Sequence, residues 1–434
     1  MIKKVVGLLK NKVTKNAGWL IFGRVFQMLM NLVVSILTAR YLGPSNYGLI
    51  NYANAYIAFF SSVCTLGINS VLVKEFVDKK GKEGEILGTS LLLRAGASVL
   101  SAISIIAIVC VADADEPMTK LVVALSVIGL LFNIFEVFKY WFQSRLQSKK
   151  AAIASLIAYS VMSVYKIVLL VTDRPVTYFA VAMSIDYIVI AVLLYIFYRR
   201  DGGGRLSVSG KYGKELLKKS YHFILPGLMI AIYGQTDKLM LKQMVGEAET
   251  GYYATASGLC TAWCFVLGAI IDSLTPVIME EHKRSSEKYD RLNRLLYCIV
   301  FYVSTGVSVL FCLFGDFAIA LLYGEAYAPA AAPLKVITWY TAFSYLGVAR
   351  NVWLVCEDKQ KYLSYVYVPA AIANVVLNLM FIPIWGATGA AVASLVAQII
   401  TSVLVPLFIR PLRKNSILML ESMIFKGVLL PRKR

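Results

Sequence analysis

The chain has 434 residues, of which 59% are hydrophobic and only 16% are charged, with a mean hydropathy of +0.69. Soluble domains are roughly 45–50% apolar and about 25% charged, so this composition excludes a water-soluble protein. The formal net charge of +19 does not indicate nucleic-acid binding, because the lysines and arginines gather in alternate segments between apolar stretches. We predict an all-α polytopic membrane protein.

Twelve apolar stretches are long enough to cross a bilayer, since a helical span needs about 20 residues. In chain order they lie near residues 16–39, 48–70, 87–111, 118–141, 151–171, 176–198, 220–241, 250–277, 292–314, 333–355, 363–384 and 387–409. Segments that follow an even number of spans are strongly basic, whereas segments that follow an odd number carry few lysines or arginines. By the positive-inside rule, both termini are predicted to face the cytoplasm.

The motif between the first two spans occurs twice. LGPSNYGLINYA (residues 42–53) aligns without a gap with VGEAETGYYATA (residues 245–256), 203 positions later. The aligned glycines are Gly43 with Gly246 and Gly48 with Gly251. A weaker echo relates TYFAVAMS from Thr177 to TGAAVASL from Thr388. Both pairs place a break between two halves near residue 205.

The repeat predicts the organisation of the chain into two helical bundles. Six spans restore the original orientation in the membrane, so the halves are expected to be parallel repeats, as in some transporters. We expect six-helix bundles at residues 1–200 and 220–409. A basic, glycine-containing cytoplasmic linker (201–219) joins them, and a basic cytoplasmic tail (410–434) follows.

Polar residues inside the first span are the first candidates for substrate binding. Gln27 and Asn31 follow Arg24 by three and seven residues, which places the three side chains on one helical stripe. We interpret this stripe as a cationic, hydrogen-bonding wall for an anionic or sugar substrate. The alternative is that Arg24 extends to the cytoplasmic headgroups.

Three further spans carry ionisable residues, which are costly inside a bilayer and therefore usually face a cavity or a partner. Gln235 and Asp237 lie in the seventh span, where Asp237 either pairs with a cation, takes up a coupling proton, or lies in the outer headgroup layer. Lys166 lies in the fifth span and Asp186 in the sixth, so these two are also candidates for a structural bridge.

The remaining polar residues in the spans are assigned mainly to packing or to the membrane surface. Asn374 and Asn378 are four residues apart on one face of the eleventh span, where they can bind substrate or hydrogen-bond to neighbouring helices. Arg94 and Arg350 lie near cytoplasmic ends of spans, and we expect both to extend to the headgroups.

No sequence motif predicts catalysis or a metal site. The chain has no recognisable nucleotide-binding loop, catalytic triad or zinc pattern, and His222 and His282 have no ligand cluster around them. The outer loops are short, which disfavours a membrane glycosyltransferase or polymerase, although that class stays open as an alternative. We therefore predict a protein that is not an enzyme, has no cofactor and binds no catalytic metal.

Four stretches of the chain resemble one transporter family. They are NAGWLIFGRVFQ from Asn16, ARYLGPSNYGLINYA from Ala39, DKLMLKQMVGEAETGYYATA from Asp237 and NVVLNLMFIPIWGATGAAVAS from Asn374. Together they resemble the Wzx-type polysaccharide flippases of the multidrug/oligosaccharidyl-lipid/polysaccharide (MOP) exporter superfamily. The resemblance extends over most of the chain, from Asn16 to about Ser394.

The resemblance implies a twelve-helix, two-bundle transporter of the bacterial cytoplasmic membrane. Such proteins move an undecaprenyl-pyrophosphate-linked oligosaccharide to the outer leaflet by alternating access, for O-antigen, capsule or related polymers. Arg24 matches the first-helix arginine of the family pattern, Asp237 matches the acidic residue of the seventh helix, and Lys166 has only a general match. Coupling to a proton gradient and coupling to a sodium gradient both stay open.

The resemblance also leaves the substrate and the partners to be identified. Another exporter with this fold, for lipid II or for drugs and cations, is the alternative within transport. Membrane lipids surround the protein, and a polymerase and glycosyltransferases of the same pathway are the expected partners. No nucleic acid is expected as a partner.

Overall fold

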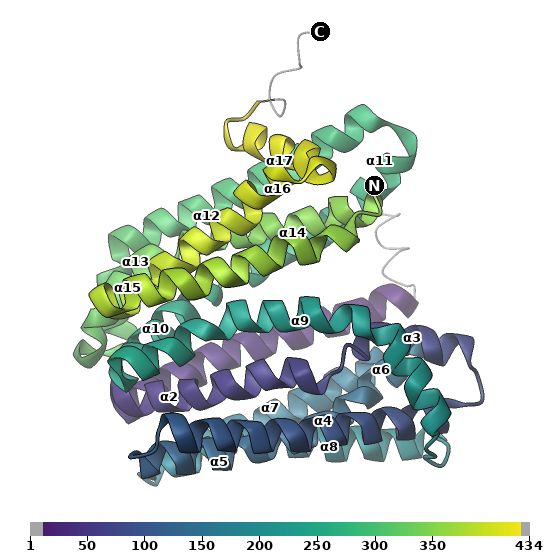
Figure 1. The fold of residues 1–434 in the computed structure, drawn as a ribbon, viewed down its shortest axis with the longest axis horizontal. Helices are drawn as coiled ribbons and strands as arrows, with labels where there is room; N and C mark the ends of the chain where they lie inside the picture. Colours follow the sequence, from purple (N-terminus) through teal and green to yellow (C-terminus); the bar gives the residue numbers. More distant parts are fainter. Residues whose placement is uncertain (1–11, 427–434) are drawn as a thin grey trace. The chain divides into compact units, whose positions relative to one another are not determined.

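A computed structural model describes the backbone of residues 12–426 and the side chains of residues 27–225 and 227–426 (Figure 1). The first helices are α2 (Lys12–Cys64), α3 (Asn69–Asp78), α4 (Glu83–Ala112), α5 (Pro117–Phe132), α6 (Val137–Ser144), α7 (Ser148–Val171) and α8 (Val176–Arg200). They are followed by α9 (Gly210–Val245), α10 (Glu247–Thr261), α11 (Phe265–Arg284), α12 (Ser286–Tyr323), α13 (Ala331–Ile337), α14 (Tyr340–Cys356), α15 (Leu363–Ile399), α16 (Val405–Phe408) and α17 (Arg410–Met423).

Short helical turns of other types connect some of these helices. Three are 3₁₀ turns, η1 (Asn133–Glu136), η2 (Glu325–Ala330) and η3 (Gln360–Tyr362), and η4 (Ile400–Leu404) is a π-helical turn. The part of the chain that the structure describes contains no β-strand. The prediction of an all-α polytopic membrane protein is confirmed.

The helices cover all twelve predicted spans within the described residues. Eight helical stretches are long and apolar enough to cross a membrane, and two of them, Gln27–Asp78 and Gln360–Phe408, each overlap two predicted spans. The predicted spans 220–241 and 333–355 are helical as well, in α9 and in α13 with α14, although they are not among those eight stretches. Helices are often longer than predicted: α12 extends beyond both ends of the expected span 292–314.

The described chain forms two compact units. The first includes Leu49–Ala231 with the chain up to Leu42, and the second includes Gly43–Gly48 with the chain from Ile232 onwards. The division therefore falls inside α9, and residues from Gly210 are already helical. The bundle boundaries at residues 200 and 220 stay a prediction.

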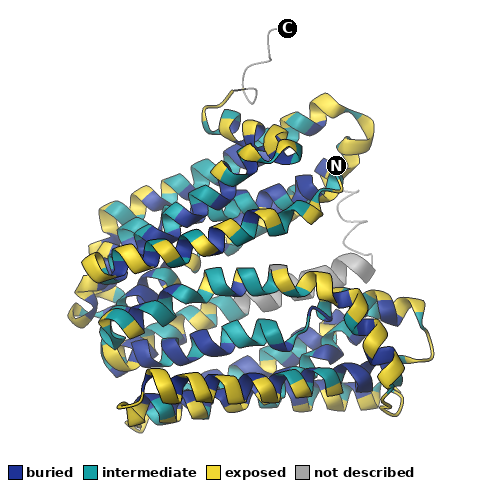
Figure 2. Ribbon diagram, in the orientation of Figure 1, coloured by how far each residue is buried: buried dark blue, intermediate teal, exposed yellow. Residues whose placement is uncertain are grey.

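Apolar and polar residues are distributed as expected for a protein surrounded by lipid. Figure 2 shows buried and exposed residues alternating along the long helices. Large apolar side chains such as Leu100, Val111 and Phe317 are exposed, while polar groups such as Arg94 and Asp237 are buried. Hydrocarbon solvates the exposed apolar faces, and the buried polar groups find their partners inside the protein.

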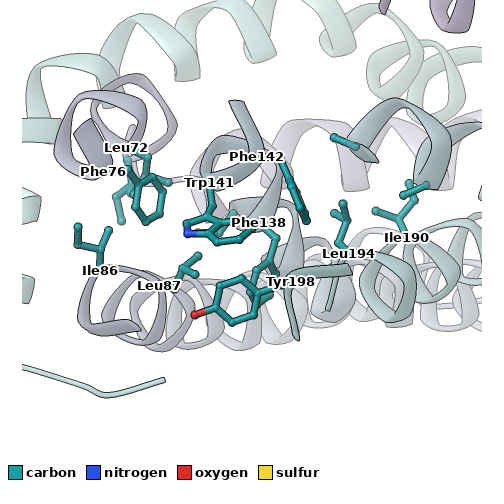
Figure 3. Close-up of a cluster of buried hydrophobic side chains, with 14 of the residues drawn as sticks. Leu72, Phe76, Ile86, Leu87, Phe138, Trp141, Phe142, Ile190, Leu194 and Tyr198 are labelled. Atoms are coloured by element: carbon teal, nitrogen blue, oxygen red, sulfur yellow. The ribbon is translucent and has the colours of Figure 1, made fainter. Parts of the chain in front are cut away.

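An aromatic core holds the first unit together (Figure 3). The Trp141 ring packs edge-on against Phe142, with 4.9 Å between ring centroids, and against Tyr198, with 4.8 Å. The helices α4, α5, α7 and α8 of this unit run side by side in Figure 1. In the second unit, Trp353 lies in a comparable buried cluster.

The repeated glycines adopt the same backbone turn in both copies of the motif. Gly43 has φ 72° and ψ 171°, and Gly246 has φ 107° and ψ −178°. Residues other than glycine rarely adopt this backbone conformation. Each glycine ends one long helical segment and starts the next. The structure thus gives a shared conformational reason for the sequence repeat.

The two copies of the motif also contact each other reciprocally within the second unit. A Cβ atom added to Gly48 would lie 1.8 Å from the backbone oxygen of Glu247, and one added to Gly251 would lie 2.1 Å from that of Pro44. Pro44 and Glu247 occupy equivalent positions of the repeat, as do the two glycines. Glycine is therefore required at both positions for the backbones to approach this closely.

Candidate functional site

Helix α15 reverses direction at Gly386, and this reversal creates the candidate site in the second unit. Gly386 has φ 55° and ψ −129°, in the region that favours glycine. A Cβ atom on Gly389 would lie 2.1 Å from the backbone oxygen of Phe381, so the helix segments on either side of the turn lie against each other. The Glu249 carboxylate accepts the Ala387 N–H at 2.7 Å and holds the turn.

The reversal brings polar side chains from both halves of α15 to the carboxylate of Asp237 on α9. From the first half, Asn374 donates its amide to Asp237 Oδ1 at 3.1 Å and Asn378 donates to the same oxygen at 2.7 Å. From the second half, Ser394 donates its hydroxyl to Asp237 Oδ2. The Tyr253 hydroxyl, from α10, also donates to Oδ2. Asp237 is only 4% exposed.

These four donors replace the water that burial removes from the carboxylate oxygens. Among the described residues, no lysine, arginine or histidine forms a salt bridge with Asp237, although Lys238 is its neighbour in the chain. Among the described residues, the carboxyl group of Asp237 is therefore held by neutral donors alone.

The same group of side chains offers oxygen atoms to a cation. Asn378 Oδ1 is buried without a hydrogen-bond partner in the described structure, and Asn374 Oδ1 accepts only a 3.3 Å hydrogen bond from Asn378. Hard cations prefer carboxylate, carbonyl and hydroxyl oxygens. No group of three or more His, Cys, Asp or Glu side chains gathers in the described part of the chain.

Comparisons with known proteins relate this architecture to a family. The family model described as "Polysaccharide biosynthesis protein" matches residues 13–282, which is more than half of the chain. The chain belongs to this family. No functionally curated protein matches it in sequence.

Several solved structures share the fold of this polysaccharide biosynthesis family member. The lipid II flippase MurJ, in an inward closed conformation, matches with a TM-score of 0.70 and 15% identity, over 93% of this chain and 90% of MurJ. A multidrug resistance MATE family transporter of the MOP superfamily, in an inward-facing conformation, matches with a TM-score of 0.66 and 17% identity, over 90% of this chain and 96% of the transporter.

A third structure, a MOP superfamily transporter from Pyrococcus furiosus, has a TM-score of 0.61 and 14% identity, over 93% of this chain and 96% of that protein. At these identities the likeness establishes the fold alone. The family member described here thus has the helical fold of MOP superfamily transporters and flippases.

The structure places three of the predicted site residues of this family member in one group, namely Asp237, Asn374 and Asn378. Gln235 is half-buried on α9 and, among the described side chains, forms no hydrogen bond with this group. Sequence reasoning missed Tyr253 and Ser394. Tyr253 lies in VGEAETGYYATA and Ser394 in TGAAVASL, two repeated stretches that predicted only the division into two halves.

The other predicted site residues lie in the first unit. Gln27 is half-buried and Asn31 exposed on α2, whereas the side chain of Arg24 lies outside the described residues. Lys166 on α7 is half-buried, and no salt bridge joins it to Asp186 among the described side chains. Substrate binding by these residues stays a prediction.

The expectation that Arg94 and Arg350 extend to the headgroups is wrong. Arg94 is 0% exposed and Arg350 is 4% exposed. Arg94 donates to the side-chain and backbone oxygens of Asn133, at 2.9 and 3.2 Å, where the 3₁₀ turn η1 interrupts the helical path between α5 and α6. A distorted turn leaves carbonyl groups available, and a guanidinium with five N–H groups can satisfy several of them.

Proposed function

We propose that this protein is a flippase that moves an undecaprenyl-pyrophosphate-linked oligosaccharide across the bacterial cytoplasmic membrane by alternating access. The family match over residues 13–282 carries the proposal, because it links the chain to polysaccharide biosynthesis. The MOP-type fold, which the chain shares with a transporter and a flippase, supports transport as the activity. The cytoplasmic placement of both termini, and the pathway partners, belong to the same proposal.

The physical demand of this reaction fits a wall of polar side chains. A pyrophosphate headgroup with an attached oligosaccharide carries negative charge and many hydroxyls, so transfer through hydrocarbon without replacement of its hydration is prohibitive. Within the proposal, the stripe of Arg24, Gln27 and Asn31 supplies charge and hydrogen bonds along the path. Lys166 supplies a second positive charge.

Asp237 is proposed to couple transport to an ion gradient. Its carboxylate is buried, bonded to four neutral donors and without a salt-bridge partner among the described residues. Binding of a proton or of Na⁺ neutralises a charge that the low-dielectric interior otherwise makes costly. Within the proposal there are two conformations, one with the carboxylate buried and one with it exposed to water. Reversible neutralisation of Asp237 therefore changes their relative stability.

A complementation experiment in a strain that lacks the protein tests the function. Loss of the protein is expected to stop surface polymer while lipid-linked repeat units accumulate on the cytoplasmic side. Units that reach the outer surface without being polymerised would instead support a polymerase. Asp237→Asn is expected to lower polymer output about 5- to 150-fold at normal protein levels, a typical range for the loss of coupling between two sites. Asp272→Asn is the matched control, since Asp272 is exposed on α11.

A further inference from the structure

A chain of buried and half-buried polar groups leads away from Asp237 along α15. The backbone oxygen of Ser394, whose hydroxyl contacts Asp237, accepts a hydrogen bond from the Tyr233 hydroxyl at 3.5 Å. The Tyr233 hydroxyl also donates to Oε1 of Gln398, one helical turn further along α15. Tyr233 thus bridges two successive turns of the helix.

The chain continues from Gln398 to the next turn. Its amide nitrogen donates to Ser402 Oγ at 2.9 Å, and Ser402 Oγ donates to the backbone oxygen of Phe343 on α14 at 2.7 Å. Gln398 is 6% exposed and Ser402 is 0% exposed, so water does not compete for these bonds. We call Ser394, Tyr233, Gln398 and Ser402 the relay.

The guanidinium of Arg350 contacts the backbone of the last relay member and holds the π-helical turn η4. Arg350 Nη1 donates to the backbone oxygen of Ser402 and Nη2 donates to the backbone oxygen of Thr401, each at 3.4 Å. Pro406 explains why these oxygens are available. Proline lacks a backbone N–H. In an α-helix the N–H at this position would donate to the backbone oxygen four positions earlier, that of Ser402, and in a π-helix to the one five positions earlier, that of Thr401. Arg350 takes the place of that missing donor.

Satisfying two carbonyl groups does not by itself require a positive charge. A neutral amide would serve the same oxygens at lower desolvation cost, whereas Arg350 is buried and has no Asp or Glu salt-bridge partner among the described side chains. Its 3.4 Å hydrogen bonds are long, and π-helical turns are frequent at functional sites. The relay therefore lies between the buried guanidinium of Arg350 and the buried carboxyl group of Asp237.

We propose that the relay transmits the charge state of Asp237 to the π-helical turn that Arg350 holds, so that neutralising Asp237 repacks residues 400–404. This inference rests on the proposed coupling role of Asp237. A proton or cation on the carboxylate competes for the oxygens that now accept the Ser394 and Tyr253 hydroxyls. The Ser394 hydroxyl must then reorient, and the Ser394 backbone oxygen, which accepts the Tyr233 hydroxyl, must shift with it. Hydrogen bonds in a low-dielectric chain polarise one another, which carries the change from Tyr233 to Gln398 and Ser402.

Amide hydrogen exchange of the full-length protein in lipid nanodiscs tests the relay. Asp237→Asn, which mimics the neutralised carboxyl, is expected to change exchange in peptides covering 400–405 by about 2- to 30-fold, the range of measured couplings between linked sites. In a Gln398→Leu background, Asp237→Asn is expected to produce no further change in the exchange of residues 400–405. Asp272→Asn is the matched control: it makes the same substitution at an exposed carboxylate of α11 and is expected to leave 400–405 unchanged.

Separate outcomes overturn the relay and the coupling site. If Asp237→Asn alters exchange near Asn374 and Ser394 but not at 400–405, the relay is wrong, whatever the polymer output of that variant. Full polymer output from Asp237→Asn instead overturns the coupling role itself. Tyr233→Phe gives a second test that keeps all four donors to Asp237: unchanged exchange at 400–405 in this variant also rejects the relay.

Discussion

The contact between the two copies of the repeated motif makes a sharp prediction for Gly48→Ala. The new Cβ atom would lie 1.8 Å from the Glu247 backbone oxygen, whereas ordinary contacts of this kind are at least about 3.4 Å. The neighbour is backbone at the start of α10, directly after the constrained Gly246, so it cannot rotate away as a side chain would. One of the two segments must therefore move by more than an ångström.

The expected cost follows from two opposing effects. Overpacking of a close contact costs about 1–3 kcal/mol, and replacing glycine by alanine inside a helix returns up to about 1 kcal/mol. We expect a net loss of about 1–2 kcal/mol, which corresponds to a fall of roughly 2–8 °C in the melting midpoint for a unit of about 200 residues. By the reciprocity of the contact, Gly251→Ala is expected to behave in the same way.

Thermal unfolding of the purified protein in detergent, followed by size-exclusion chromatography with fluorescence detection, measures this shift. Gly258→Ala is the matched control, because it lies in α10 and an added Cβ atom meets nothing within 4 Å. The control is expected to keep or slightly raise the midpoint. Equal midpoints for Gly48→Ala and Gly258→Ala would refute the close reciprocal contact.

Three further changes are expected to have distinct effects. Gly386→Ala is expected to lower the melting midpoint, because it combines a φ of 55° with a Cβ atom 2.5 Å from a Glu249 oxygen; an unchanged midpoint argues against the turn. Trp353→Ala removes a fully buried indole and is expected to cost about 3–5 kcal/mol, measured in the same assay. Hydrogen bonds from Lys219 lower the pKa of Glu215, at the start of α9, to about 2 from 4.5. A depressed pKa stabilises the fold only while the carboxyl is ionised, so its contribution is present above about pH 4.5 and is lost toward pH 2. The midpoint difference between the wild type and Glu215→Gln should therefore shrink over that interval, and a constant difference would contradict the pairing.

Much of the fold was predictable because hydropathy and charge alternation act locally along the chain. The twelve spans correspond to helices, and the repeated Gly43 and Gly246 mark equivalent breaks in the helical path. Helix lengths were less predictable, because helices such as α12 continue past the apolar stretch into polar residues. Apolar character reports contact with lipid, whereas helix ends depend on capping and backbone turns.

The candidate site was predictable only in part. Asp237, Asn374 and Asn378 stood out because polar groups are rare in apolar spans, but their convergence depends on where two helices pack. Ser394 was missed because it becomes a neighbour of Asp237 only through the reversal of α15 at Gly386.

The two arginine predictions failed for a related reason. The sequence shows that Arg94 and Arg350 lie near span ends, which normally favours extension to the headgroups. It does not show that interrupted helical turns present carbonyl oxygens to them inside each unit. For Arg350 one signal was available, since Pro406 removes the backbone donor that the oxygens of Thr401 and Ser402 would otherwise have.

Transport of a labelled lipid-linked oligosaccharide in proteoliposomes tests the central claim most directly. The purified protein is reconstituted with undecaprenyl-pyrophosphate-linked repeat units, and a membrane-impermeant glycan-modifying enzyme measures how fast units from the inner leaflet become accessible outside. We predict that the rate at which units become accessible rises with an imposed proton or sodium gradient. With Asp237→Asn this rate is expected to fall to that of protein-free vesicles, whereas with Asp272→Asn it is not. The proposed function would be contradicted if vesicles with the wild-type protein showed the same accessibility as protein-free vesicles under both gradients.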